Sequence, residues 1–159
     1  MAHTRGNLTR RTVLAAGMAG LVLYGFGAKL AQAADPIYTG TLSNTAVQGY
    51  DPVAYFKAGK QTKGSKDFAV DYKGTTWLFS SQANLEAFKA DPEAFAPQYG
   101  GYCAWAVSQG YTAKGDADHW RIVDGKLYLN YSAGVQAEWE QNIPGNIAAA
   151  DSNWPKVLK

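Results

Sequence analysis

Sulfur and imidazole side chains are scarce in this chain. It has one cysteine, Cys103, and two histidines, His3 and His119. Thiolate and neutral imidazole are the side chains that best suit soft metal ions such as copper. A cysteine can also act as a nucleophile or redox group when a neighbouring base or a helix N-terminus activates it. Cys103 and His119 are therefore the first candidates for a metal site, and Cys103 is the candidate for thiol chemistry.

The N-terminus has the pattern of an export signal. Arg10 and Arg11 precede an apolar run over residues 13–27, and small residues follow at positions 31–33. The run is shorter than the roughly 20 residues that span a bilayer, and the small residues suit a signal peptidase. We therefore expect residues 1–33 to be a cleaved twin-arginine signal peptide and the mature protein to be periplasmic or otherwise exported. An uncleaved membrane anchor is the alternative, against which Lys29 argues.

Removal of this segment changes what chemistry the chain can support. The segment carries both methionines, His3 and several basic residues but no acidic one, so the formal net charge of +2 becomes slightly negative. One cysteine and one histidine cannot form a four-ligand zinc site, a methionine-rich copper site or an internal disulfide. The mature sequence has no basic patch for nucleic acid, and we expect no stable membrane insertion after cleavage. A partner would be a periplasmic protein or a second protomer.

Local patterns predict an α+β fold, a small single domain with two β-hairpins and several short helices. Turn signals at Lys73-Gly74 and Asp124-Gly125 separate two pairs of strand-like runs, at residues 68–72 with 75–79 and at residues 120–123 with 126–131. Capping residues and apolar spacing predict one helix after Ser80 or Ser81, one after Asp91 and one that opens at the Gly100-Gly101 pair. Two more helices are expected over residues 132–142 and 144–158. Residues 34–46 are expected to be a polar lead-in and residues 47–159 the domain. No internal repeat is visible.

Three stretches become distinctive in combination: VQGYDPVAYF at 47–56, WLFSSQANLEAFKADPEAF at 77–95 and YGGYCAWAV at 99–107. Together they resemble the YHS domain family, and more narrowly its exported bacterial branch. The family resemblance implies a metal-binding module with one cysteine just after Asp-Pro-Val and two at the hairpin-to-helix junction. Those positions here hold Ala54, Ser80 and Asn84, so the usual heavy-metal site does not transfer. In some relatives selenocysteine stands in the place of Cys103, which draws attention to that residue.

We therefore expect a YHS-like module that binds or handles a soft metal ion, copper or similar, through Cys103 with His119 or with a partner's ligands. The first alternative is a thiol redox protein or sensor with Cys103 as its reactive residue. That alternative requires a helix that begins near Gly101, so that its free N–H groups stabilise a thiolate. The second alternative is a non-catalytic interaction domain. No motif for an enzyme is found, so we favour a binding role over catalysis.

Each candidate residue also has a purely structural interpretation. Cys103 has small neighbours that suit a core, and free cysteine is often buried. His119 fits a half-exposed position at a strand edge, and its neighbours Asp116 and Asp118 fit a solvated loop. Five further residues could line a small pocket but equally suit packing and turn formation. They are Tyr50, Asp51, Tyr55, Tyr102 and Trp105.

Overall fold

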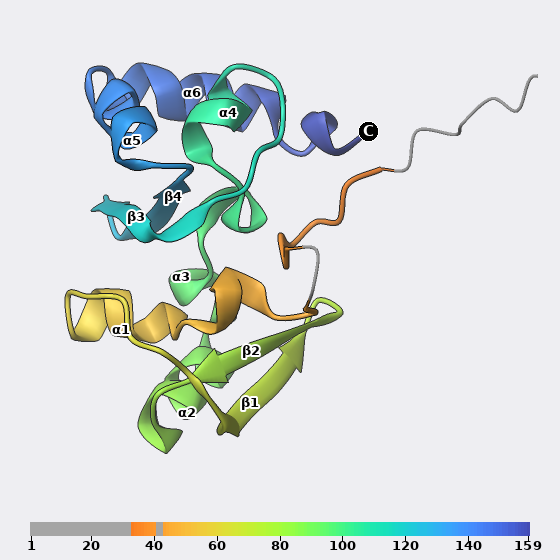
Figure 1. The fold of residues 1–159 in the computed structure, drawn as a ribbon, viewed down its shortest axis with the longest axis vertical. Coiled ribbons are helices and arrows are strands. Elements are labelled where there is room, and N and C mark those ends of the chain that lie inside the picture. Colours follow the sequence, from red (N-terminus) through yellow and green to blue (C-terminus); the bar gives the residue numbers. More distant parts are fainter. Residues whose placement is uncertain (1–32, 41–42) are drawn as a thin grey trace, which may run out of the picture. The chain divides into compact units, whose positions relative to one another are not determined.

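A computed structural model describes residues 33–40 and 43–159 of the protein (Figure 1). These residues belong to one compact unit. The twin-arginine signal lies outside the described residues and stays a prediction. In the part of the chain that is described, no helix combines the length and the apolar character needed to cross a membrane.

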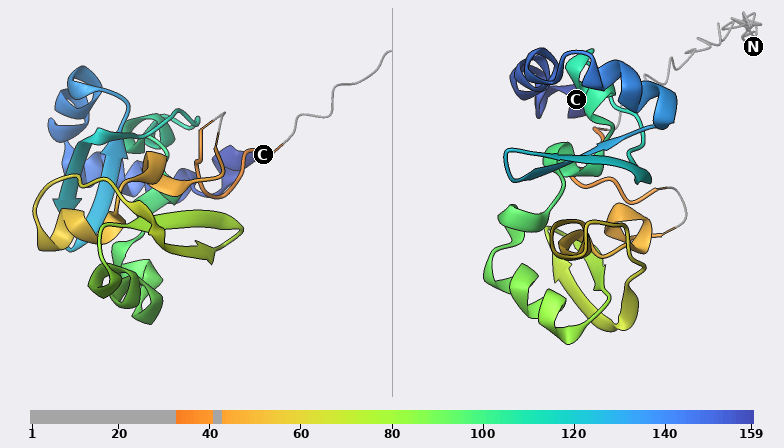
Figure 2. Two further views of the ribbon diagram at one scale, coloured as in Figure 1. Left: turned by 60° about the horizontal axis from the view of Figure 1, so that its bottom comes forward. Right: turned by 90° about the vertical axis from the view of Figure 1, so that its left-hand side faces the viewer.

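The chain runs through the same series of elements twice. The first half contains, in order, η1 (Ala46–Gly49), α1 (Pro52–Lys57), β1 (Ser65–Tyr72), β2 (Thr75–Phe79), α2 (Gln82–Ala90) and α3 (Pro92–Phe95). The second half contains η2 (Gln98–Gly101), α4 (Ala104–Ser108), β3 (Asp116–Val123), β4 (Lys126–Asn130), α5 (Ala133–Glu140) and α6 (Ile143–Asn153), and the short η3 (Lys156–Leu158) follows. Figure 1 and the right-hand view of Figure 2 show the two halves one above the other. The predicted α+β class is confirmed.

Local details repeat along with the order of elements. Val47 and Tyr99 occupy the same place in η1 and η2, and both have a left-handed φ, of 50° and 54°. Ser81 and Ser132 cap α2 and α5 in the same way, each accepting a hydrogen bond from the backbone N–H three residues later. The expectation that the chain has no internal repeat is therefore wrong. The repeat is hidden because most side chains differ between the halves, whereas the residues that set turns and caps are similar.

Both predicted hairpins are confirmed. β1 pairs with β2 and β3 pairs with β4, each pair antiparallel, so the fold has two two-stranded sheets. Lys73 and Gly74 have φ values of 51° and 76°, and Asp124 and Gly125 have values of 49° and 72°. Two consecutive left-handed residues form the tight turn whose twist suits a two-residue hairpin.

The helix starts follow the capping residues, with one shift. Ser81 caps α2 and Asp91 caps α3, as expected from the sequence. The helix expected to open near Gly101 begins instead at Ala104 and has five residues. Cys103 is its N-cap residue, with non-helical backbone angles, rather than a residue of its first turn.

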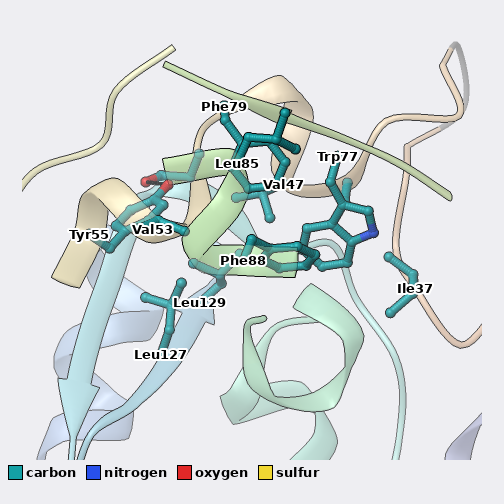
Figure 3. Packing of buried hydrophobic residues seen from close by; sticks show 12 residues of the cluster. Ile37, Val47, Val53, Tyr55, Trp77, Phe79, Leu85, Phe88, Leu127 and Leu129 are labelled. Carbon is teal, nitrogen blue, oxygen red and sulfur yellow. Dashed lines mark hydrogen bonds between the residues drawn. The ribbon is translucent and has the colours of Figure 1, made fainter. Parts of the chain in front are cut away.

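Aromatic pairs fill the core of both halves. In the first half the rings of Trp77 and Phe88 lie 4.9 Å apart, and in the second half the corresponding rings of Tyr128 and Trp139 lie 5.4 Å apart. Leu129 of β4, in the second half, belongs to the same buried cluster as Trp77 and Phe88 of the first half (Figure 3). The two halves therefore share buried apolar surface, whose removal from water is the main term that favours folding.

The lead-in segment is packed against the second half of the fold. Ile37 is buried, and the backbone N–H of Tyr38 donates to the carbonyl of Gly100 at 2.9 Å. Gly100 has a φ of 61°, and a Cβ at this position would lie 1.8 Å from the carbonyl oxygen of Pro36. Only glycine allows so close an approach of the two backbones. The first glycine of the GGYC stretch is therefore explained by packing.

Candidate functional site

A completely buried carboxylate, Asp51, begins the polar arrangement of the first half. Asp51 is the N-cap residue of α1, and its Oδ1 accepts hydrogen bonds from the backbone N–H groups of Val53 at 2.9 Å and Ala54 at 3.3 Å. The sequence interpretation that Asp51 bonds the backbone of its own turn is confirmed. An N-cap of this kind satisfies N–H groups that have no partner within the helix.

The other oxygen of Asp51 connects α1 to the start of α2. Its Oδ2 accepts hydrogen bonds from the backbone N–H of Ser80 at 2.8 Å, the hydroxyl of Ser80 at 2.6 Å and the amide nitrogen of Asn84 at 2.7 Å. Ala54, Ser80 and Asn84, the three positions at which the family pattern would place cysteines, therefore converge on Asp51. None offers sulfur, and the polar groups bond to one another. This set does not fit a soft metal ion.

Cys103 occupies in the second half the place that Asp51 has in the first. The backbone N–H groups of Trp105, Ala106 and Tyr131 lie around its sulfur and act to lower the pKa of the thiol, although its side chain makes no capping hydrogen bond to α4. The first two correspond in position to the N–H groups of Val53 and Ala54 that cap α1, and the third corresponds to the N–H of Ser80 at the start of α2. A cradle that holds a carboxylate in one half therefore surrounds a thiol in the other.

Burial decides the protonation of this thiol. Cys103 is 1% exposed, and burial raises the pKa of its thiol above the ordinary value, although the three N–H groups act in the opposite direction. The expectation that a helix start lowers the pKa of this thiol is therefore wrong, because desolvation outweighs the effect of the N–H groups around the sulfur. The thiol lies 3.8 Å from Oδ1 of the fully buried Asn130, to which it donates. Among the described residues, the amide nitrogen of Asn130 has no hydrogen-bond partner.

A cavity of about 230 Å³ opens beside Cys103. Its walls are mostly apolar and aromatic, and they consist of Cys103, Trp105, Ala106, Tyr111, Ala113, Tyr131 and Val135. Tyr111 and Tyr131 are 48% and 47% exposed, so the cavity adjoins the solvent at these two rings. Tyr131 and Val135 take the places of Ser80 and Asn84. The second half thus lacks the polar groups that fill the site of the first half.

His119 is held on β3, with a strand between it and Cys103. Cys103 bridges to Leu129 of β4, and Leu129 pairs on its other side with Trp120, the neighbour of His119. Two strand spacings amount to roughly 10 Å. His119 does not line the cavity beside Cys103. Over residues 33–40 and 43–159, no three or more His, Cys, Asp or Glu side chains form a group that could hold a metal ion.

The remaining aromatic candidates are dispersed over the fold. The ring of Tyr50 lies under the ammonium group of Lys63, at 4.3 Å. The buried hydroxyl of Tyr55 donates to a carbonyl of β3 at 2.9 Å, and that of Tyr102 donates to a carbonyl of the lead-in at 2.8 Å. Of these candidates, only Trp105 shares the cavity with Cys103.

Sequence reasoning missed four residues around the cysteine: Asn130, Tyr111, Tyr131 and Val135. Their relation to Cys103 depends on the pairing of β4 and on the start of α5, which are distant in sequence. An alignment of the two halves through the hairpin turns Lys73-Gly74 and Asp124-Gly125 would have pointed to Tyr131 and Val135.

Comparisons with known proteins give one result that bears on this geometry. No curated protein and no solved structure matches the chain. Residues 53–99 match the family model of the YHS domain. This segment extends from α1 into η2, so it takes in α1, the first hairpin, α2 and α3, and ends before Cys103. Over residues 53–99, therefore, the chain is similar to a YHS domain.

Proposed function

We propose that the protein is an exported, YHS-like binding domain that takes a soft metal ion, copper(I) or similar, as its cargo at Cys103. The observation that carries the proposal is the position of the cavity. Cys103 lines it in the place of Asp51. The other three corresponding wall residues, Ala106, Tyr131 and Val135, take the places of Ala54, Ser80 and Asn84, the three positions at which the family pattern would have cysteines. The first half has filled this place with hydrogen bonds, whereas the second half leaves space beside a sulfur atom.

The chemistry at Cys103 follows from its surroundings. The buried thiol keeps its proton when free, so binding of a soft cation must displace that proton to solvent. The backbone N–H groups of Trp105, Ala106 and Tyr131 then stabilise the charge on sulfur. Cys103 supplies one ligand only. The remaining ligands come from the molecule that delivers the ion, which reaches the sulfur past the exposed ring of Tyr111.

The redox alternative has less support. A redox cysteine is typically accessible and has a lowered pKa, whereas the Cys103 sulfur is buried and its pKa is raised. An interaction domain without a ligand is the remaining alternative, and the metal titration separates it from the proposal.

The test is an anaerobic copper(I) titration of the purified protein against a chromophoric chelator. We expect the protein to withdraw up to one equivalent of copper from the chelator and Cys103→Ser to withdraw none. His119→Ala serves as the matched control, because it removes the other soft donor, and it should bind as the unchanged protein does. Equal and weak binding by the unchanged protein and Cys103→Ser would overturn the proposal. Circular dichroism checks that each variant is folded.

Export is the second part of the proposal, and it rests on the N-terminal sequence alone. Arg10 and Arg11 form the twin arginine, and residues 31–33 provide the cleavage site. Replacement of both arginines by lysine should leave the uncleaved precursor in the cytoplasm, and the mature protein should begin at Ala34. Processing that continues unchanged in the double variant would contradict this route.

A further inference from the structure

A second cavity, larger than the one beside Cys103, lies where the two halves and the lead-in meet. Its volume is about 650 Å³, which is within the range of small-molecule sites. Lining residues come from the lead-in, the turn of the first hairpin, α3 and the segment after it, α6 and the C-terminal residues. Neither Cys103 nor any other residue of the smaller cavity is among them.

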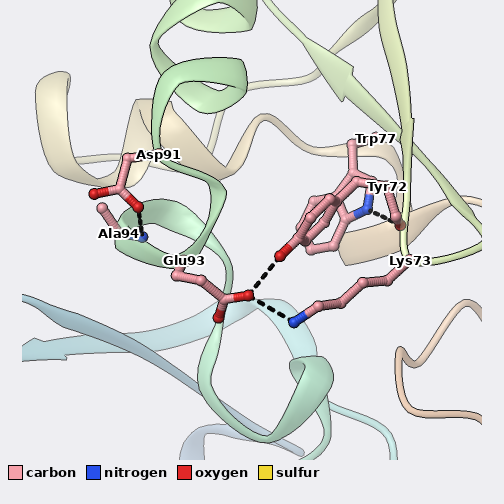
Figure 4. Close-up of polar contacts among 6 residues, drawn as sticks. All are labelled: Tyr72, Lys73, Trp77, Asp91, Glu93 and Ala94. Carbon is pink, nitrogen blue, oxygen red and sulfur yellow. Dashed lines mark hydrogen bonds and ion pairs between the residues drawn. The ribbon is translucent and has the colours of Figure 1, made fainter.

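Two tyrosine–carboxylate pairs line this cavity. The hydroxyl of Tyr72 donates to Oε1 of Glu93 at 2.5 Å, and the ammonium group of Lys73 donates to the same oxygen at 2.6 Å (Figure 4). On the α6 side, the hydroxyl of Tyr99 donates to Oδ1 of Asp151 at 2.8 Å. Each carboxylate is thus held in place through one of its two oxygens.

The protonation of these groups suits a site that accepts hydrogen bonds. The hydrogen bonds from Lys73 and Tyr72 lower the pKa of Glu93, so its carboxylate stays ionised at neutral pH. The bond to Glu93 raises the pKa of the Tyr72 hydroxyl. Burial, together with the bond to Asp151, raises the pKa of the Tyr99 hydroxyl. Both hydroxyls therefore remain donors, and each keeps its carboxylate oriented.

The second oxygens of the carboxylates are available to a ligand. Within residues 33–40 and 43–159, Oε2 of Glu93 and Oδ2 of Asp151 accept no hydrogen bond from the protein. Lys73 is the one cation among the lining residues, and its ammonium group is already paired with Glu93. The cavity therefore has a net negative charge and two free acceptors, a combination that favours a cationic donor over an anion.

An aromatic wall completes the site. Trp154 lines the cavity and is half-buried, and its ring lies 5.9 Å from the ring of Tyr99. Indole and phenol faces attract organic cations as well as apolar groups. We propose that this cavity binds a small organic cation, with an apolar or aromatic body against Trp154 and a protonated amine or amidine at Asp151 and Glu93.

Three probes of nearly equal shape test this proposal by titration calorimetry of the purified protein: benzamidine, benzamide and benzoate. Benzamidine carries the positive charge, benzamide is its neutral analogue and benzoate its anionic one. We expect saturable binding of benzamidine, weaker binding of benzamide and no binding of benzoate. Binding of benzoate as tight as that of benzamidine would overturn the proposal, as would the absence of benzamidine binding at millimolar concentrations.

Substitutions locate the binding. Asp151→Asn retains the bond from Tyr99 but removes the charge, and it should weaken benzamidine binding by about fivefold, as expected for one exposed ion pair. Asp124→Asn removes the same charge from the exposed turn of the second hairpin and should leave binding unchanged. Equal affinities of these two variants would place the ligand elsewhere. Cys103→Ser should bind benzamidine normally, so that this test is independent of the copper proposal.

Discussion

Replacement of Asp51 is the most direct test of how the first half is held together. Asp51→Ala removes the cap of α1, worth about 1 kcal/mol. It also leaves the Ser80 N–H and the Asn84 amide without their charged acceptor, at about 1–3 kcal/mol for each donor left unpaired. Ser80 and Asn84 are half-buried, so water can compensate in part. We therefore expect the free energy of unfolding to fall by about 3–5 kcal/mol.

Asp91→Ala is the matched control for this loss. Asp91 also precedes a proline and caps a helix, but it is exposed and its side chain accepts one bond, from the N–H of Ala94 at 3.2 Å. Its replacement should cost about 1 kcal/mol. Asp51→Asn should still cost more than about 2 kcal/mol, because an amide nitrogen would face the donors of Ser80 and Asn84.

Urea unfolding followed by tryptophan fluorescence and circular dichroism measures these differences. The slope of the free energy against urea should stay constant, which shows that the variants unfold from the same compact state. The reasoning would be refuted if Asp51→Ala cost no more than Asp91→Ala. That result would mean that the bonds across to Ser80 and Asn84 contribute nothing beyond the cap.

Three further predictions concern the thiol, the buried indoles and the ion pair. Burial raises the pKa of the Cys103 thiol, so the rate of its alkylation by iodoacetamide should rise at a higher pH in the folded protein than in the urea-unfolded chain, whose thiol has an ordinary pKa near 8.5; a folded midpoint below the unfolded one contradicts this. Trp139→Phe should cost less than Trp77→Phe in urea unfolding, because the Trp139 N–H has no partner among the described residues while that of Trp77 bonds the Tyr72 carbonyl at 3.1 Å. Glu93→Gln should lower stability by less than about 1 kcal/mol, since the pair is exposed. This difference should vanish as pH falls through the lowered pKa of Glu93, and a larger or pH-independent loss would contradict it.

Local chemistry accounts for the parts of the fold that could be predicted from sequence. The Asp124-Gly125 turn, the Ser81 cap and the Asp91-Pro92 helix start each depend on residues within a few positions of one another. Backbone angles and caps at such sites are determined by short-range sterics and hydrogen bonds. The same reasoning failed at Cys103. A short-range argument predicts a stabilised thiolate there, but burial by distant segments raises the pKa of the thiol instead.

The two cavities could not be predicted because they depend on distant parts of the chain. Cys103 meets Asn130 and Tyr131 only because α4 packs against the end of β4. Likewise Glu93 and Asp151 line one cavity although one lies in each half. The sequence does not show them as neighbours, and neither spacing nor composition distinguishes them from other surface acids.

The duplication changes how the family resemblance should be applied to this chain. Residues 53–99 match the YHS model, yet Ser80 and Asn84 of that segment bond to Asp51, just before it, and these three residues close the site without offering sulfur. The open position, with Cys103 at its wall, belongs to the other half and lies beyond the matched segment. Because a carboxylate that bonds five donors is costly to expose, the first half is suited to stability. Ligand chemistry at this place in the fold must therefore be sought in the second half, where the same cradle of N–H groups surrounds a thiol and the space beside it is free.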